Sequence, residues 1–245
     1  MIPREWIVPD WPAPPRVRAF ATTRHGGVSE GEYGTFNLAT SSGDDPQHVA
    51  RNRLILREAL PEMPDWLVQR HTVDVARWGS TKPESPTVAD GAVTNVPGRV
   101  CSVLTADCMQ LLLCNEEGTQ VGAVHAGWRG MAAGVIENGV RALGVDPATV
   151  MAWMGPTIGQ DAFEVGPEVR EAFMAVDRTA DQAFRTGKPG KYHADLYHLA
   201  RQRLERAGVT RVYGGGFCTY HERDRFFSYR RAQKSGRLGA FIWIT

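Results

Sequence analysis

The chain has 245 residues, and its 28 lysines and arginines nearly balance its 27 aspartates and glutamates. The formal net charge of +1 argues against a protein that binds nucleic acid through bulk positive charge. A hydrophobic fraction of 42% with 22% charged residues argues against disorder, and no apolar run approaches the roughly 20 residues that span a bilayer. We therefore expect a globular protein without nucleic-acid or membrane partners, folded as one domain over residues 1–245.

The cysteine content indicates the redox environment. Cys101, Cys108, Cys114 and Cys218 are few for a chain of this length, and they form no CxxC pair. The N-terminal residues also lack the basic and apolar regions of a signal peptide. We expect a reduced, cytoplasmic protein with free thiols.

The first half of the chain mixes strand-like and helical patterns. A proline-rich start leads into a predicted strand at residues 17–23. Asp45 and Pro46 form an acidic N-cap and a first-turn proline, and they predict a helix over residues 46–60. Short strand-like runs follow at residues 66–69, 73–78, 92–96 and 100–104.

The second half begins with a continuous apolar run at residues 109–114, which a turn connects to a predicted strand at residues 121–125. Predicted helices then cover residues 130–143, 167–176 and 195–207, and predicted strands cover residues 150–154, 209–213 and 238–244. Several strand pairs have hairpin-length connections, and strands and helices do not alternate steadily. The pattern therefore favours an α+β, mixed-sheet fold over a doubly wound parallel sheet.

Three residues that can bind a metal or act as a nucleophile stand at the ends of strand-like segments. They are His71, Cys108 and His125. Two imidazoles and one thiolate form a plausible zinc site, and three protein ligands leave a fourth position for water, as in catalytic sites. Zinc lowers the pKa of such a water to around 7, so hydroxide would exist at neutral pH.

Each of these residues also has an ordinary structural interpretation. Considered alone, His71 is interpreted as an ordinary hydrogen-bonded histidine, and Cys108 is interpreted as a small buried apolar residue. His125 has the stronger functional signal, because glycines and Arg129 follow it at a strand-to-helix junction that exposes anion-binding N–H groups. The three positions lie far apart and match no compact local motif.

Other polar residues have two open interpretations. Asp107 is either a general base or ligand-orienting group, or a turn residue. Arg129 and Arg230 are either anion-binding groups or solvated arginines. Arg24 and Asn37 lie in glycine- and asparagine-containing segments, whose composition indicates special backbone geometry more than chemistry.

Several segments that occur in one order along the chain carry a family resemblance. They include residues 23–29 (TRHGGVS), 105–108 (TADC), 124–130 (VHAGWRG), 155–159 (GPTIG) and 227–231 (FSYRR). The chain resembles the YfiH family of laccase-domain proteins, also called YfiH-type purine nucleoside phosphorylases and peptidoglycan editing factors. The resemblance extends from near residue 20 to the C-terminus.

The resemblance implies a single mixed α/β domain with layered β-sheets flanked by helices. It implies that His71, Cys108 and His125 bind one zinc ion, with copper as the less favoured alternative. The implied activity is phosphorolysis of purine nucleosides, with adenosine deamination as a companion reaction, so that the partners are a purine nucleoside and phosphate. A multicopper laccase is not expected, because the 7 histidines include no HxH pair.

For this activity we also assign expected roles to individual residues. Cys108, His125 and Asp107 are the expected catalytic residues. The expected substrate contacts are Arg24, Asn37, Arg129 and Arg230. Two other functions remain open: a metal-free hydrolase of a peptidoglycan-precursor conjugate, with Cys108 as nucleophile and His125 as base, and a nucleoside sensor without catalysis.

Overall fold

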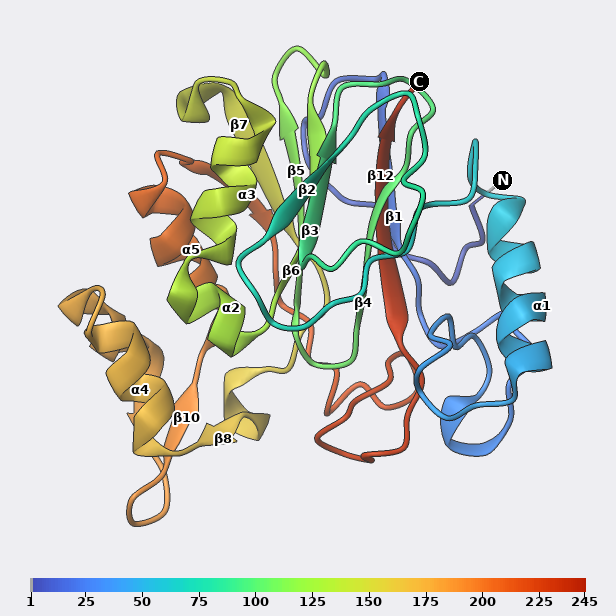
Figure 1. Cartoon of the computed structure of the whole chain (residues 1–245). Helices are drawn as coiled ribbons and strands as arrows, with labels where there is room; N and C mark the ends of the chain where they lie inside the picture. The colour runs from blue at the N-terminus through green and yellow to red at the C-terminus, as the bar shows by residue number, and fades with distance from the viewer. Residues whose placement is uncertain (1) are drawn as a thin grey trace.

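The computed structural model describes residues 2–245 (Figure 1). The largest of its sheets has six strands in the order β11-β7-β5-β6-β3-β2. These strands are Val75–Trp78 (β2), Gly91–Thr94 (β3), Met109–Asn115 (β5), Val121–Ala126 (β6), Val150–Met154 (β7) and Arg211–Gly214 (β11). Strand β5 runs antiparallel to β6 and β7, whereas β2 with β3 and β7 with β11 are parallel pairs. The sheet is mixed, as the sequence predicts.

A second sheet packs against the first and has the antiparallel order β1-β12-β4. Its strands are Val17–Ala21 (β1), Cys101–Thr105 (β4) and Leu238–Ile244 (β12). In β12, Ala240 and Ile242 face the six-stranded sheet, whereas Phe241 and Trp243 face away from it. Because both faces of β12 are covered, its sequence is a continuous apolar run rather than an alternating one.

Helices cover the two outer faces of this pair of sheets (Figure 1). On the far side of the six-stranded sheet lie Trp128–Ala133 (α2), Val135–Leu143 (α3) and Leu196–Arg206 (α5). Pro46–Arg57 (α1) packs through Leu56 beside the outer face of the three-stranded sheet. The layered α+β fold with flanking helices is therefore confirmed.

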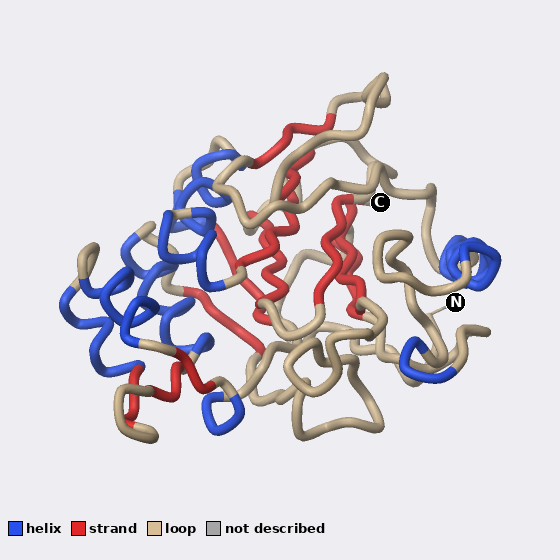
Figure 2. Tube along the Cα trace, turned by 60° about the horizontal axis from the view of Figure 1, so that its bottom comes forward, coloured by secondary structure: helices blue, strands red, loops and turns tan. Residues whose placement is uncertain are grey.

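A small third sheet lies at the edge of the helical layer, beside Pro167–Met174 (α4), and Figure 2 shows this helical side against the sheets. Its order is β8-β10-β9, made of Glu164–Val165 (β8), Phe184–Thr186 (β9) and Tyr192–Ala194 (β10). Strands of two or three residues are too short to give a periodic signal, so these three were not predicted from the sequence. Short 3₁₀ helices cover Gly31–Tyr33, Pro147–Thr149, Gln160–Ala162 and Arg178–Ala183.

Two predictions of secondary structure are wrong. The helix expected over residues 130–143 is two helices, because Gly134 adopts a left-handed φ of 107° between α2 and α3. The strand expected at residues 66–69 is reduced to one isolated bridge between Val68 and Val88. There the side-chain amide of Gln69 donates to and accepts from the backbone of Leu104, so a side chain rather than a strand satisfies this edge of β4.

The strand registers bring several chain segments to one end of the six-stranded sheet. Met109 at the start of β5 pairs with Ala126 at the end of β6, and Gly91 at the start of β3 pairs with Val75 at the start of β2. The loops before β2, β3 and β5 therefore meet beside the end of β6. In the described part of the chain, no helix has the length and apolarity needed to cross a membrane.

Candidate metal centre

Three side chains with metal-binding atoms meet at this end of the sheet. His125 lies on β6, Cys108 directly precedes β5, and His71 lies in the loop before β2. Because Gln110 on β5 pairs with His125, the residues just before β5 stand next to this imidazole. One ligand atom of each of the three side chains lies within 4.8 Å of the other two. The structure thus brings together residues that are up to 54 positions apart, from 71 to 125.

The cluster has an inner and an outer side. The Cys108 sulfur lies 3.7 Å from Nε2 of His71, and the two histidine rings meet edge to face with centroids 4.8 Å apart. His125 is buried, Cys108 is half-buried and His71 is exposed. Two nitrogens and one sulfur suit zinc or copper, and the open side leaves room for a further ligand.

Gly127, the residue before α2, keeps space beside the cluster. A Cβ atom at this position would stand 2.7 Å from Cδ2 of His71 and 2.9 Å from the sulfur of Cys108. Its φ of −65° and ψ of 158° are open to any residue, so packing and not backbone conformation requires glycine here. The donor set and the space that Gly127 preserves both fit a bound metal ion.

A buried carboxylate that was not among the predicted site residues, Asp90, supports this cluster. Its Oδ1 lies 2.7 Å from Nδ1 of His125 and accepts from the backbone N–H of His71 at 3.0 Å. Its Oδ2 accepts from the backbone N–H groups of Arg70 and Thr72 and from the Thr72 hydroxyl. The available signal was a single acidic residue within the otherwise uncharged run at residues 88–94 (VADGAVT).

The charges of the cluster favour a thiolate beside an imidazolium when no metal is bound. Burial would raise the pKa of Cys108, but the charge and hydrogen bonds of His125 and His71 outweigh burial and lower it to about 6. Burial would lower the pKa of His125, but the Cys108 charge and the bond with Asp90 raise it to about 9. Burial likewise opposes ionisation of Asp90, yet its hydrogen bonds with His125, Thr72 and Arg70 hold its pKa well below the usual range.

Asp107 shapes the turn that presents Cys108. It has a left-handed φ of 85°, and its backbone oxygen accepts from the N–H of Ile158 at 3.0 Å. Its carboxylate accepts from the Thr219 hydroxyl at 2.6 Å and from the Arg230 backbone N–H at 2.7 Å. These bonds place Asp107 as an anchor between chain segments beside the cluster. Its expected catalytic role stays a prediction.

The cluster of His71, Cys108 and His125 lines a cavity of about 950 Å³. Arg129 and Arg230, two of the expected substrate contacts, line this cavity together with Arg53, Arg70 and Arg237. In the described residues 2–245, none of these five guanidinium groups forms an ion pair with a carboxylate. A cavity wall with unpaired arginines favours an anionic ligand.

The aromatic rings of the cavity hold several of these arginines in place. The guanidinium carbon of Arg129 lies 4.4 Å from the ring centroid of Trp128, and that of Arg53 lies 4.1 Å from Trp66. Burial lowers the pKa of Arg53 to about 10, which leaves it charged at neutral pH. Stacking on rings orders the guanidinium groups without neutralising their charge.

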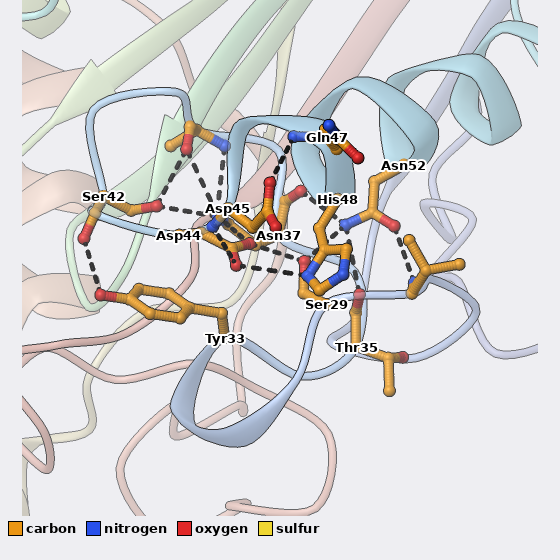
Figure 3. Close-up of polar contacts among 12 residues, drawn as sticks. Ser29, Tyr33, Thr35, Asn37, Ser42, Asp44, Asp45, Gln47, His48 and Asn52 are labelled. Carbon is orange, nitrogen blue, oxygen red and sulfur yellow. Dashed lines mark hydrogen bonds and ion pairs between the residues drawn. The ribbon is translucent and has the colours of Figure 1, made fainter.

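The other two expected substrate contacts lie outside the cavity lining. Arg24 donates to the backbone oxygens of Gly34 and Arg223. Asn37 is fully buried, and its amide donates to Ser42 and Asp44, as Figure 3 shows. Both side chains organise loops at this end of the molecule. Their assignment to substrate remains a prediction without a supporting contact.

Comparison with known proteins places the chain in a family. The model of a family described as multi-copper polyphenol oxidoreductase laccase matches residues 18–245. A Shigella flexneri protein named purine nucleoside phosphorylase YfiH is 51% identical over 240 residues, covering 97% of this chain and 98% of that protein. An Escherichia coli K12 protein of the same name is 50% identical over 240 residues, with the same coverage.

A solved structure is similar over the same extent. The crystal structure of the Neisseria meningitidis protein NMB0706 matches with a TM-score of 0.94 and 45% identity, covering 98% of this chain and 99% of that one. The chain belongs to the YfiH family. Within residues 2–245 of this YfiH-family chain, one group of at least three His, Cys, Asp or Glu side chains is arranged to hold a metal, the set of His71, Cys108 and His125.

Proposed function

We propose that this YfiH-family chain is a zinc-dependent purine nucleoside phosphorylase with a companion adenosine deaminase activity. The observation that carries the proposal is the convergence of His71, Cys108 and His125 in a cavity lined by arginines without carboxylate partners. The names of the Shigella and Escherichia relatives, purine nucleoside phosphorylase YfiH, support the same reaction class.

The metal would be held by one sulfur and two ring nitrogens. Thiolate and imidazole are ligands that zinc prefers, and zinc bound there would supply Lewis acidity and lower the pKa of a bound water. Asp90 holds the inner histidine ligand through its Nδ1, and Gly127 keeps the space beside His71 and Cys108 free. These residues therefore prepare the site before a substrate arrives.

The arginines of the cavity suit phosphate as the second substrate. In phosphorolysis a phosphate oxygen forms a bond to C1′ of the ribose, the bond from C1′ to the purine nitrogen breaks, and the purine leaves with the electron pair and takes a proton. Arg129 and Arg230 line the cavity and carry the guanidinium groups that bind phosphate oxygens in pairs. In deamination, the oxygen of a water forms the new bond to C6 of adenine and ammonia leaves.

Chromatography of adenosine, inosine and guanosine incubated with the purified chain tests this proposal. Free base that forms only with phosphate indicates phosphorolysis, and inosine formed from adenosine indicates deamination. His71→Ala and Cys108→Ala should lose both zinc and activity, whereas His221→Ala, which removes an exposed histidine outside the cluster, should keep both. Tight purine binding without turnover would instead favour a nucleoside sensor.

A second function is favoured by one specific arrangement. Asp90, His125 and Cys108 follow one another as orienting carboxylate, imidazole and thiol, which is the order used by cysteine hydrolases. In this hypothesis the Cys108 sulfur bonds to the carbonyl carbon of an amide or ester, and the amine or alcohol leaves with a proton from His125. Water then hydrolyses the thioester, and no metal takes part. A metal-depleted chain that retains activity and forms a covalent adduct at Cys108 would support the hydrolase and refute the zinc proposal.

A further inference from the structure

We propose that Asp90 is the positioning residue of the candidate metal centre, and that its one carboxylate sets the orientation of both histidine ligands. The inference rests on the proposed zinc site. It concerns a residue that touches neither a substrate nor the metal position, so its effect reaches the reaction only through His71 and His125.

The first part of this role concerns the ring of His125. An ionised carboxylate has no proton to donate, so the proton in the contact of 2.7 Å between Asp90 and His125 lies on Nδ1 of the ring. In the neutral ring that binds a metal, the lone pair is then on Nε2, the nitrogen that remains for the metal. Asp90 and His125 are buried, so the contact between the carboxylate and Nδ1 is shielded from solvent.

The second part concerns the loop that carries His71. This residue has a φ of 58°, a left-handed conformation that side chains rarely adopt. The consecutive N–H groups of Arg70, His71 and Thr72 donate to Asp90 over 3.0, 3.0 and 2.7 Å. Successive N–H groups around a left-handed residue form a concave anion-binding nest, and here the bound anion is the Asp90 side chain.

The side chain of Asp90 can be changed without removing the strand pairing around it. Its backbone N–H donates to the oxygen of Asp74 over 2.9 Å, and its backbone oxygen accepts from the N–H of His125 over 2.7 Å. These bonds join the start of β3 to its two neighbours and do not involve the carboxylate. An effect of the side chain on metal binding is therefore separable from an effect on the sheet.

The variant that tests the role is Asp90→Asn. A side-chain amide has one acceptor oxygen and two N–H donors, so it cannot accept from all the donors that surround Asp90. Where its NH₂ group faces Nδ1 of His125, that nitrogen becomes an acceptor and the ring proton moves to Nε2, toward the other ligands. Loss of such a supporting carboxylate lowers metal affinity by about 10- to 100-fold, and we expect a loss in this range.

The matched control is Asp74→Asn. It makes the same change of charge three residues from His71, at an exposed side chain that forms no hydrogen bond within residues 2–245. Zinc affinity is measured by competition with a chromophoric chelator, and cobalt substituted for zinc reports the ligand geometry through its visible spectrum. Asp90→Asn should weaken zinc binding and alter the cobalt spectrum, whereas Asp74→Asn should match the wild type in both.

The outcomes separate this inference from the proposed function. Equal zinc affinity and equal cobalt spectra for the wild type and Asp90→Asn would overturn the role of Asp90 while leaving the zinc site in place. A wild-type chain that binds no zinc would overturn the zinc proposal itself. Neither measurement depends on turnover of a nucleoside.

A second pair of variants covers the case in which Asp90→Asn does not fold. Thr72→Val removes the hydroxyl, which donates to Asp90 over 3.0 Å and accepts from the backbone N–H of Asp74 over 3.2 Å, and Thr72→Ser keeps it. We expect a loss of zinc affinity in Thr72→Val that Thr72→Ser recovers. Identical affinities in the two variants would contradict the proposed control of the His71 loop by Asp90.

Discussion

Replacing Gly127 with alanine tests whether the space between the candidate ligands is built for a metal. The new Cβ atom would stand 2.7 Å from a carbon of His71 and 2.9 Å from the sulfur of Cys108. Ordinary contacts between such atoms are about 3.5–4.0 Å, so the ligand atoms would have to move by roughly 0.6–1.3 Å. Metal–ligand distances tolerate deviations of only about 0.2 Å, which is several times smaller than that movement.

We therefore expect Gly127→Ala to bind zinc at least tenfold more weakly, a loss of about 1.4 kcal/mol or more. The fold should survive the change. Overpacking costs about 1–3 kcal/mol, and the lower entropy of the unfolded chain with alanine returns about 0.4–1 kcal/mol. The metal-free variant should thus lose at most about 2.6 kcal/mol of unfolding free energy.

Chelator competition measures the zinc affinity, and urea denaturation of the metal-free protein measures stability. The control is Gly79→Ala, at a glycine with open space around its Cβ position, which should bind zinc as the wild type does. If Gly127→Ala binds zinc with wild-type affinity through the same residues, the space that Gly127 leaves beside His71 and Cys108 is not required for metal binding.

Three further predictions follow from the same geometry. In the metal-free chain, the rate of alkylation of Cys108 by iodoacetamide should rise through pH 6, because its thiolate forms above a pKa of about 6. Cys101 and Cys114 are buried, and burial raises the pKa of both thiols, so they should stay unreactive. Peptide mass spectrometry measures the alkylation of Cys108 at each pH, and added zinc should suppress this alkylation. A midpoint near pH 8.5 would contradict the charge pairing between Cys108 and His125. Asp107→Ala leaves the Thr219 hydroxyl and the Arg230 backbone N–H without an acceptor and places alanine in a left-handed conformation. Urea denaturation should therefore show a free energy of unfolding that is lower by about 2–4 kcal/mol. A decrease of less than about 1 kcal/mol would refute the anchoring role. Arg129→Gln removes one guanidinium group from the cavity wall. In steady-state kinetics the variant should have a KM for phosphate about tenfold higher, with little change in the KM for adenosine. Equal effects on the two KM values would argue against a contact between Arg129 and phosphate.

Much of the secondary structure was readable from local patterns. The strands Val150–Met154 and Leu238–Ile244 were predicted with the bounds that the structure has, because unbroken apolar runs of five to seven residues are typical of strands covered on both faces. The helix at residues 46–60 was predicted from its Asp45 cap and Pro46, and it ends at Arg57. Local capping and periodicity act within a few residues and therefore leave a signal in the sequence itself.

Polar residues were harder to interpret than apolar ones. Arg24 and Asn37 were expected to contact substrate; in the structure they bind the backbone and side chains of neighbouring loops, and the expected contact stays a prediction. A buried polar side chain that satisfies a loop and one that binds a ligand have the same composition and the same sequence surroundings. The distinction depends on which donors and acceptors surround the side chain after folding.

Residue types at the ends of strand-like segments, together with the family resemblance, were enough to nominate His71, Cys108 and His125, because sulfur and imidazole carry their chemistry wherever they are placed. Folding alone decided that these atoms meet, since that depends on registers between strands that are distant in the chain. Folding also decided the supporting role of Asp90, whose hydrogen-bond partners lie 18 to 35 positions away in the sequence. A carboxylate becomes a support for two histidines only when packing removes water and brings those partners to it, and no local pattern encodes that event.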